Sequence, residues 1–174
     1  MKIIYSRNTS IDQIISSFND GDYIIISGKP GTGTITLGTQ ILANIAVKNG
    51  NHVQYISLKN EVDTIVNDLK KQAMDMYGIN ITDTTDSPFL IDTVTAFQPS
   101  ISIIDLFINK RKDSNCKIAF IDCLTLINHP EGIKAISEQL RTFAKENGIM
   151  IMAASTTPLE ISKELNPDVL IFTD

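Results

Sequence analysis

The sequence has few of the residues that define covalent frameworks or membrane segments. It has only two cysteines, Cys116 and Cys123, which form no C-x-x-C pair. Their scarcity excludes the disulfide-dense pattern of small secreted domains. No apolar run approaches the roughly 18 residues of a membrane span, and the N-terminus lacks a signal-peptide pattern. We therefore expect a reduced, cytoplasmic protein with no membrane partner.

Basic residues and histidines are also scarce. The chain has 15 Lys and Arg against 20 Asp and Glu, a net charge of −5. That balance argues against a broad electrostatic surface for nucleic acid, so we expect weak or no direct nucleic-acid binding. His52 and His129 have no cysteine or carboxylate at a spacing typical of a metal site. No Ser/His/Asp arrangement can be identified, and we predict no catalytic residue.

Length and hydrophobic pattern indicate one globular domain over residues 1–174. Hydrophobic residues make up 43% and charged residues 20% of the chain, as in ordinary globular proteins. Helical spacing predicts helices over residues 11–18, 34–48, 62–76 and 133–144, and a further one after Pro99. Apolar or β-rich runs predict strands over residues 23–26, 52–58, 88–92, 117–122, 149–154 and 169–172.

The alternation of these segments predicts the fold class. Strands that alternate with helices of this length form βαβ units, whose strands run parallel. We expect a three-layer α/β domain with a mostly parallel sheet and helices on both faces. Ligands of such folds bind at the carboxyl ends of the strands.

One glycine-rich stretch connects the strand at 23–26 to the helix at 34–48. Such a loop points backbone N–H groups at a phosphate, aided by the positive end of the helix dipole. Its spacing fits the first six positions of the phosphate-loop motif G-x-x-x-x-G-K-[ST]. The predicted cofactor-binding residues are Gly28, Lys29, Pro30, Gly31, Thr32, Gly33, Thr34 and Ile35.

The last two motif positions differ. Thr34 occupies the position of the lysine that reaches the β- and γ-phosphates, and Ile35 that of the magnesium-binding hydroxyl. Thr36 carries a hydroxyl but lies about 100° further around the helix. The alternative interpretation is a glycine-rich turn that binds no phosphate.

Asp122 is the candidate metal ligand. It ends the apolar run Ile118-Ala119-Phe120-Ile121, a pattern typical of the Walker B strand, whose acidic residue helps to hold magnesium. The alternative is an aspartate that is hydrogen-bonded at a strand terminus for structural reasons. Ser155, Thr156 and Lys59 also lie at or just beyond predicted strand ends.

Five segments, in order, resemble the RecA-like ATPase core of replicative DnaB-type helicases. They cover nearly the whole chain, and each is similar to a family strand or motif: Gly21–Thr34 to G-D-…-R-P-S-M-G-K-T, Tyr55–Leu58 to F-S-L-E, Lys117–Ile127 to the strand that ends in I-D-Y-L-Q-L, Ala153–Thr156 to A-L-S-Q, and Pro167–Phe172 to D-A-D-…-I. The resemblance implies a RecA-like P-loop NTPase fold, with ATP or ADP and Mg²⁺ as cofactors.

The departures from the family pattern indicate a degenerate Walker A motif and a pseudo-ATPase. The family's loop lysine falls on Thr34, its water-activating glutamate on Lys59 and its γ-phosphate-sensing glutamine on Thr156. Glu61 and Lys29 are the only candidates to compensate. The segment between Ser155 and the last strand is also shorter than in the family, where it includes a DNA-contacting loop.

Three functions follow as alternatives. The first is a binding or regulatory module that has lost ATP hydrolysis, binds nucleotide weakly and contacts a protein partner, either helicase-like subunits or a second copy. The second is a divergent but active ATPase subunit of a DNA helicase or recombinase assembly. The third is a structural α/β domain that binds no nucleotide.

Overall fold

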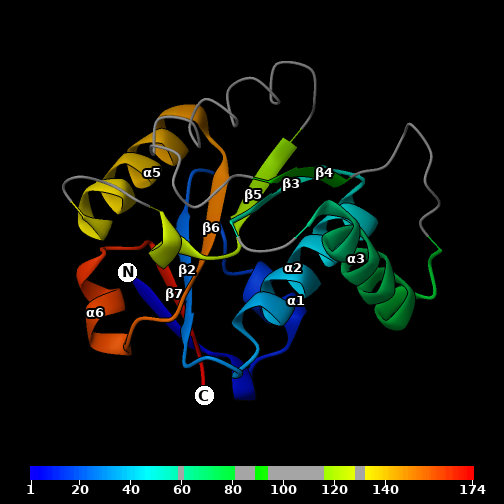
Figure 1. Ribbon diagram of the computed structural model, residues 1–174, viewed down its shortest axis with the longest axis horizontal. Coiled ribbons are helices and arrows are strands. Elements are labelled where there is room, and N and C mark those ends of the chain that lie inside the picture. The colour runs from blue at the N-terminus through cyan, green and yellow to red at the C-terminus, as the bar shows by residue number, and fades with distance from the viewer. Residues whose placement is uncertain (59–60, 81–88, 94–115, 128–131) are drawn as a thin grey trace.

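The computed structural model describes residues 1–58, 61–80, 89–93, 116–127 and 132–174 (Figure 1). Its strands form one seven-stranded sheet in the order β1-β7-β2-β6-β5-β3-β4. Every neighbouring pair is parallel. The strands are β1 (Lys2–Tyr5), β2 (Tyr23–Gly28), β3 (His52–Ser57), β4 (Phe89–Thr93), β5 (Cys116–Ile121), β6 (Met150–Ser155) and β7 (Val169–Thr173).

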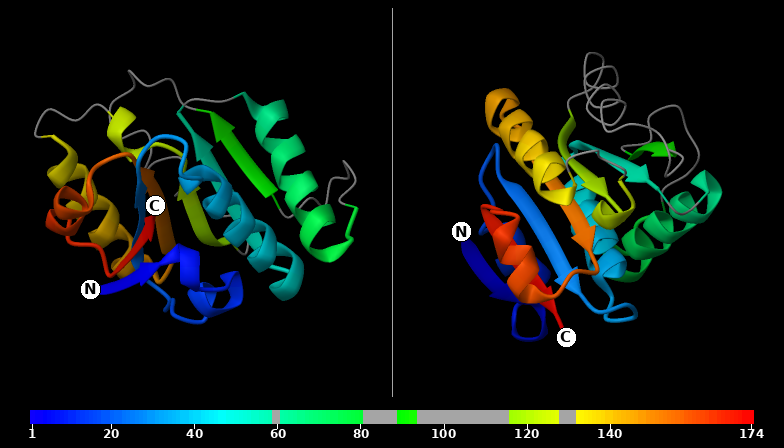
Figure 2. Two further views of the ribbon diagram at one scale, coloured as in Figure 1. Left: turned by 90° about the horizontal axis from the view of Figure 1, so that it is seen from below. Right: turned by 60° about the vertical axis from the view of Figure 1, so that its left-hand side comes forward.

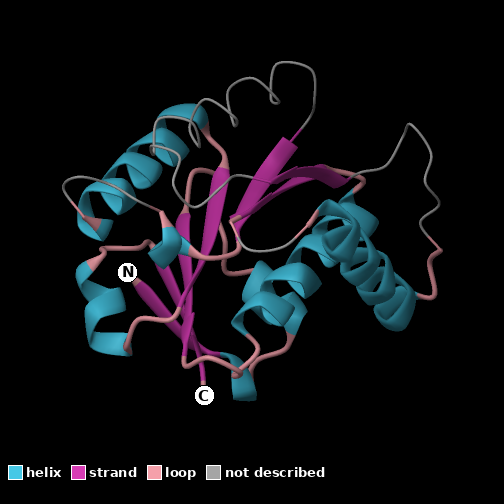
Figure 3. Ribbon diagram, in the orientation of Figure 1, coloured by secondary structure: helices cyan, strands magenta, loops and turns pink. Residues whose placement is uncertain are grey.

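Helices cover both faces of this sheet (Figures 1 and 3). One face carries α1 (Ile11–Ile15), α2 (Thr34–Asn49) and α3 (Val62–Tyr77), and the other carries α5 (Ile133–Asn147) and α6 (Leu159–Glu164). Short 3₁₀ turns, η1 (Ser6–Asn8) and η2 (Leu124–Leu126), follow β1 and β5. The predicted three-layer α/β fold is therefore confirmed.

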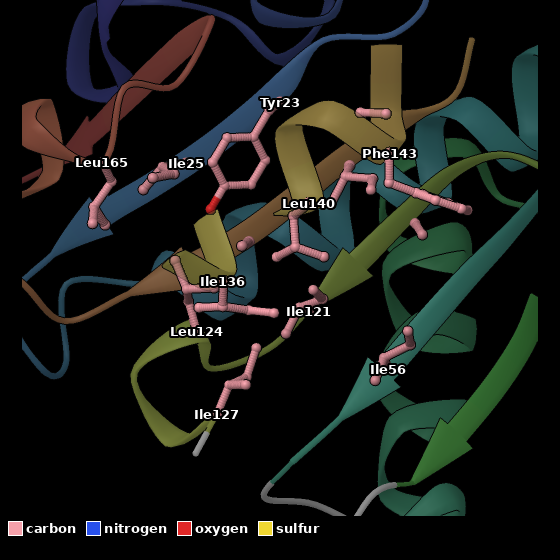
Figure 4. Packing of buried hydrophobic residues seen from close by; sticks show 14 of the residues in the cluster. Tyr23, Ile25, Ile56, Ile121, Leu124, Ile127, Ile136, Leu140, Phe143 and Leu165 are labelled. Atoms are coloured by element: carbon pink, nitrogen blue, oxygen red, sulfur yellow. The ribbon is translucent and has the colours of Figure 1, made fainter. Parts of the chain in front are cut away.

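Two apolar cores lie between the sheet and its helices. The central strand β2 is buried at every position, as expected for a parallel strand covered on both faces. Ile25 of β2 and Leu140 of α5 both belong to the first core (Figure 4), and Ile24 packs with residues of α1 and α2 in the second. The hydroxyl of Tyr23 meets that of Ser137 on α5 at 2.9 Å, and burial raises the pKa of Tyr23.

Local signals in the sequence set the helix ends. The side chain of Ser10 accepts a hydrogen bond from the Gln13 N–H, and the Gln13 side chain accepts one from the Ser10 N–H, which forms a capping box. Glycines follow the last residues of α2, α3 and α5 in the left-handed conformation that ends helices. These helices agree with the predicted ranges to within a few residues.

Two elements were not predicted. The strand β1 is only four residues long and mostly exposed, so it lacks the buried pattern of the other strands. The helix α6 occupies the segment after β6 that the sequence analysis treated as a shortened connection. The predicted helix after Pro99 lies outside the described residues, as does His129. Among the described helices, none is long and apolar enough to cross a membrane.

Candidate functional site at the carboxyl edge of the sheet

The glycine-rich loop between β2 and α2 forms a tight turn followed directly by the helix. Both the N–H and the hydroxyl of Thr32 donate to the carbonyl oxygen of Lys29, at 3.1 and 2.8 Å. Gly31 and Gly33 each have φ of +87°, a conformation that residues with a Cβ rarely adopt. The backbone conformation therefore explains why glycine occupies residues 31 and 33 in this chain.

Gly28 is required for a different reason. A Cβ at this position would lie 2.0 Å from the hydroxyl oxygen of Thr173 and 2.4 Å from that of Thr32. The loop consequently closes against the end of β7, and the two segments lie side by side in both views of Figure 2.

The helix α2 begins directly after the loop. The first helical bond runs from the Leu37 N–H to the Gly33 carbonyl, at 2.8 Å. The N–H groups of the first helical turn have no partner within the helix and carry the positive end of its dipole. Lys29, Pro30 and Gly31 are exposed around this end. Exposed residues of the loop thus surround the first turn of α2.

The side chains at the last two motif positions do not supply the usual chemistry. Ile35 is partly buried and packs against the apolar core on the α2 face of the sheet. Thr34 is also partly buried, whereas Thr36 is exposed. An apolar side chain that contributes to packing therefore occupies the position of the magnesium-binding hydroxyl.

Asp122 follows β5 and is 1% exposed. One carboxylate oxygen accepts a hydrogen bond from the Ser57 hydroxyl at 2.6 Å, and the other accepts one from the Leu58 N–H at 2.8 Å. The Asp122 N–H in turn donates to the Ile56 carbonyl at 3.1 Å. These bonds join the end of β5 to the end of β3, so the buried carboxylate serves as a bridge between strands.

The loop and Asp122 lie at the same edge of the sheet, as predicted for a common site. Their strands are not direct neighbours, because β6 pairs with β2 on one side and with β5 on the other. Ser155 at the end of β6 therefore lies between the two predicted groups.

A belt of hydroxyls from three buried serines and the partly buried Thr157 crosses this edge and was not identified from the sequence. Ser155 contacts Thr157 at 2.7 Å, Thr157 contacts Ser162 at 2.6 Å, and Ser162 donates to Ser27 at 2.9 Å. Ser27 donates to the Thr157 carbonyl at 2.8 Å. Since each hydroxyl has one proton, these bonds fix the direction of donation from Ser155 through Thr157 and Ser162 to Ser27.

The hydroxyl belt attaches α6 to the ends of β2 and β6. Ser27, Ser155 and Ser162 are each at most 1% exposed, and buried hydroxyls need such partners. The available signal in the sequence was a serine near the end of each of these two strands, Ser27 in β2 and Ser155 in β6. It was insufficient because Thr157 and Ser162 lie on a segment whose fold could not be predicted.

The other candidates from the sequence differ in whether the structure describes them. Lys59 lies outside the described residues. Glu61 is exposed at the start of α3, and Thr156 is exposed after β6. Within the described ranges, no group of three or more His, Cys, Asp or Glu residues is placed to hold a metal ion. Ile35 offers no oxygen ligand, and both carboxylate oxygens of Asp122 accept hydrogen bonds from the end of β3.

Comparisons with known proteins agree with this architecture. The structure is similar to the KaiC-like protein PH0186 of Pyrococcus horikoshii OT3, with a TM-score of 0.64 and 18% identity over 81% of this chain and 63% of that one. It is similar to a DnaB-like replicative helicase, reported with its interactions with primase, with a TM-score of 0.63 and 17% identity over 84% of this chain and 41% of that one. The chain thus spans less than two thirds of the length of either protein.

A family model identifies the group to which the chain belongs. No curated protein matches the chain. The family described as the DnaB-like helicase C terminal domain matches residues 4–164. With that match over nearly its whole length and a parallel RecA-like sheet, the chain belongs to the DnaB-like helicase C-terminal domain family.

Proposed function

We propose that this chain is a DnaB-type domain that has lost efficient ATP hydrolysis and acts as a binding or regulatory module. The observation that carries the proposal is the packing of Ile35 against the apolar core at the position where the family binds magnesium through a hydroxyl. A side chain without oxygen at this position cannot coordinate the ion, and its burial gives it a structural role instead.

Further changes at the same edge support the loss of hydrolysis. Thr34 replaces the phosphate-binding lysine, and Lys59 stands where the resemblance places the glutamate that activates water. Removal of one preorganised electrostatic group costs roughly 10²- to 10³-fold in rate. Because several such groups are replaced together, we expect turnover no faster than the background reaction.

The bonds of Asp122 are consistent with this proposal. Each carboxylate oxygen accepts a short hydrogen bond from the end of β3, and the side chain is buried. These bonds give Asp122 a structural role that does not require catalysis. We therefore propose a strand-bridging role for Asp122 in place of metal binding.

Weak binding of ATP or ADP is part of the proposed function. The turn at Gly31 and Gly33 and the N–H groups at the start of α2 provide a backbone cradle for phosphate. Without the lysine and the hydroxyl, the last two motif positions supply no charge or metal ligand to the β- and γ-phosphates. Mg²⁺ would accompany the nucleotide, held by the phosphates themselves.

The proposed partner is a protein, either a helicase-like subunit or a second copy of this chain. Support comes from membership of the helicase family together with the acidic net charge of −5, which disfavours direct nucleic-acid binding. The DnaB-like helicase that resembles this chain was reported with its interactions with primase, so a protein contact has a structural parallel.

An ATPase assay tests the proposal. The purified chain is incubated with ATP and Mg²⁺, with and without single-stranded DNA, beside an Asp122→Asn variant. We expect phosphate release at the background rate in every sample. Magnesium-dependent turnover near 1 s⁻¹, roughly the low end of ordinary enzymes, that is lost in Asp122→Asn would instead establish the active-ATPase alternative.

One observation favours that alternative. Lys29 is exposed at the tip of the loop, where its ammonium group is available to a phosphate of a neighbouring molecule. If turnover is found and Lys29→Ala abolishes it, this lysine compensates for the missing motif lysine.

A further inference from the structure

The end of the last strand is bonded directly to the tip of the glycine loop. The hydroxyls of Thr32 and Thr173 lie 2.9 Å apart, and the Thr173 hydroxyl lies 3.3 Å from the Ser27 carbonyl oxygen, a second acceptor for its proton. Thr173 is 3% exposed, so its hydroxyl lies in the interior. The contact joins residues that are distant in the sequence and brings the ends of β2 and β7 and the loop to one point.

The packing around Gly28 shows how closely these groups approach. A Cβ on Gly28 would lie within 2.4 Å of both threonine hydroxyl oxygens. The absence of a side chain on Gly28 therefore makes room for the pair. The Thr32 hydroxyl also lies 2.8 Å from the Lys29 carbonyl oxygen, so the same side chain closes the turn and bonds it to β7.

We propose that the hydroxyls of Thr32 and Thr173, here named the threonine latch, hold residues 28–33 in their turn conformation without any bound anion. Glycines at φ of +87° have wide conformational freedom, which an unliganded loop would otherwise retain. The latch restricts that freedom through a buried contact with the sheet. Thr173 is thus a positioning residue for the loop, although it lies at the far end of the sequence.

The latch concerns the loop in its unliganded form and does not depend on whether the domain binds or hydrolyses ATP. If the proposed function were wrong, the latch would still stand. If the latch were wrong, the proposed function would still stand.

Amide hydrogen exchange of the full chain, measured by NMR without nucleotide, tests the latch. We compare wild type with Thr173→Val, Thr173→Ser and Thr32→Val. Loss of a single hydrogen bond should speed exchange at Gly31, Thr32 and Gly33 by about two- to tenfold in both valine variants. Thr173→Ser keeps the hydroxyl and should retain the wild-type rates.

A matched control is Thr39→Val. Thr39 is also a nearly buried threonine, and its hydroxyl donates to the Thr36 carbonyl within α2, at 2.8 Å. This variant should leave loop exchange unchanged. Amides of β6 report global unfolding, so acceleration at the loop amides that exceeds any acceleration at β6 identifies local loosening of the loop.

Two results would overturn the latch. One is wild-type exchange of the loop amides in a folded Thr173→Val protein, and the other is equal acceleration in Thr39→Val. If Thr173→Val does not fold, Thr32→Val decides the matter, because Thr32 is only partly buried and its replacement is tolerated more easily. Wild-type loop exchange in Thr32→Val would then reject the proposal.

Discussion

The hydroxyl of Ser57 donates to the carboxylate of Asp122 across the ends of two neighbouring strands, at a distance of 2.6 Å. The second carboxylate oxygen accepts from the Leu58 N–H at 2.8 Å. A residue that the sequence pattern marks as a metal ligand therefore holds β3 and β5 together in the folded chain. This dual interpretation is testable, because a bridge affects stability whereas a metal ligand affects turnover.

We predict that Asp122→Ala lowers the free energy of unfolding by about 2–4 kcal/mol, because two buried donors lose their acceptor. Asp122→Asn is the matched control. Its amide oxygen still accepts from the Leu58 N–H, and its NH₂ group can donate to the Ser57 hydroxyl, so most of the stability should remain. Urea unfolding of both variants gives the comparison. An alanine variant as stable as wild type would contradict the bridging role.

The second prediction concerns pH and the contacts of Asp168. Its carboxylate accepts from Arg141 at 3.0 Å and from the Tyr23 N–H at 3.1 Å, and the Lys145 ammonium lies 3.5 Å away. Partial burial acts to raise the pKa of Asp168, but these bonds and charges outweigh it, so the pKa falls below the ordinary value of 3.8. The contacts join α5 to the amino ends of β2 and β7.

A carboxylate whose pKa is lower in the folded state stabilises the fold at any pH above its unfolded-state pKa. This stabilisation is lost as the pH falls through the folded-state pKa. We therefore expect Asp168→Asn to be less stable than wild type at pH 7, by about 1–3 kcal/mol. The difference should shrink as the pH falls below about 4. Guanidinium unfolding between pH 3 and 7 measures it.

Glu164→Gln provides the control for this experiment. The hydrogen bond from Lys134 and its charge lower the pKa of Glu164, but both side chains are exposed. Water screens such surface pairs, so we expect no measurable change. A constant stability difference between Asp168→Asn and wild type from pH 3 to pH 7 would show that the carboxylate charge contributes nothing.

The third prediction concerns nucleic acid. The chain has a net charge of −5, so it should cause no mobility shift of single-stranded DNA at protein concentrations below about 10⁻⁴ M in ~0.15 M salt. That concentration is the weak end of the range of nonspecific dissociation constants. A shift assay with a length-matched duplex as a second probe checks this. Submicromolar binding to either probe would reveal a basic surface that the overall charge conceals.

Much of the architecture could be predicted because the signals are local. The continuous apolar run of β2 and the capping box at Ser10 identify their elements from neighbouring residues alone. The short strand β1 could not be recognised, because only its pairing with β7 makes it a strand. For the same reason the helix α6 was missed: its buried serine gains partners only when β2 and β6 are assembled.

The candidate site was predicted only in part for similar reasons. Positions in the glycine loop follow from spacing, and one of the loop's two positive φ angles falls on Gly33, which the motif defines as glycine. By contrast, the Ser57 partner of Asp122 comes from β3 and the Thr173 partner of Thr32 comes from β7. Contacts between distant segments depend on strand order, which the sequence pattern left open.

The last prediction distinguishes a phosphate loop that has lost side chains from one that has lost its shape. The double variant Thr34→Lys with Ile35→Thr restores the motif lysine and the hydroxyl on the existing backbone. A lysine–phosphate contact is charge-assisted, so ATP affinity should rise by roughly 10²-fold, about 2.7 kcal/mol. Calorimetry on wild type and the double variant measures the gain.

Hydrolysis should remain at background in the double variant, because the resemblance places the missing catalytic base at Lys59, which is still a lysine. Only the triple variant with Lys59→Glu should show turnover. Ile35→Thr alone is the necessary stability control, since it removes an apolar side chain from the second core. If the double variant unfolds at the same urea concentration as this control yet binds ATP no better than wild type, the backbone cradle does not bind phosphate. The structural α/β domain without nucleotide would then be the better description of this chain.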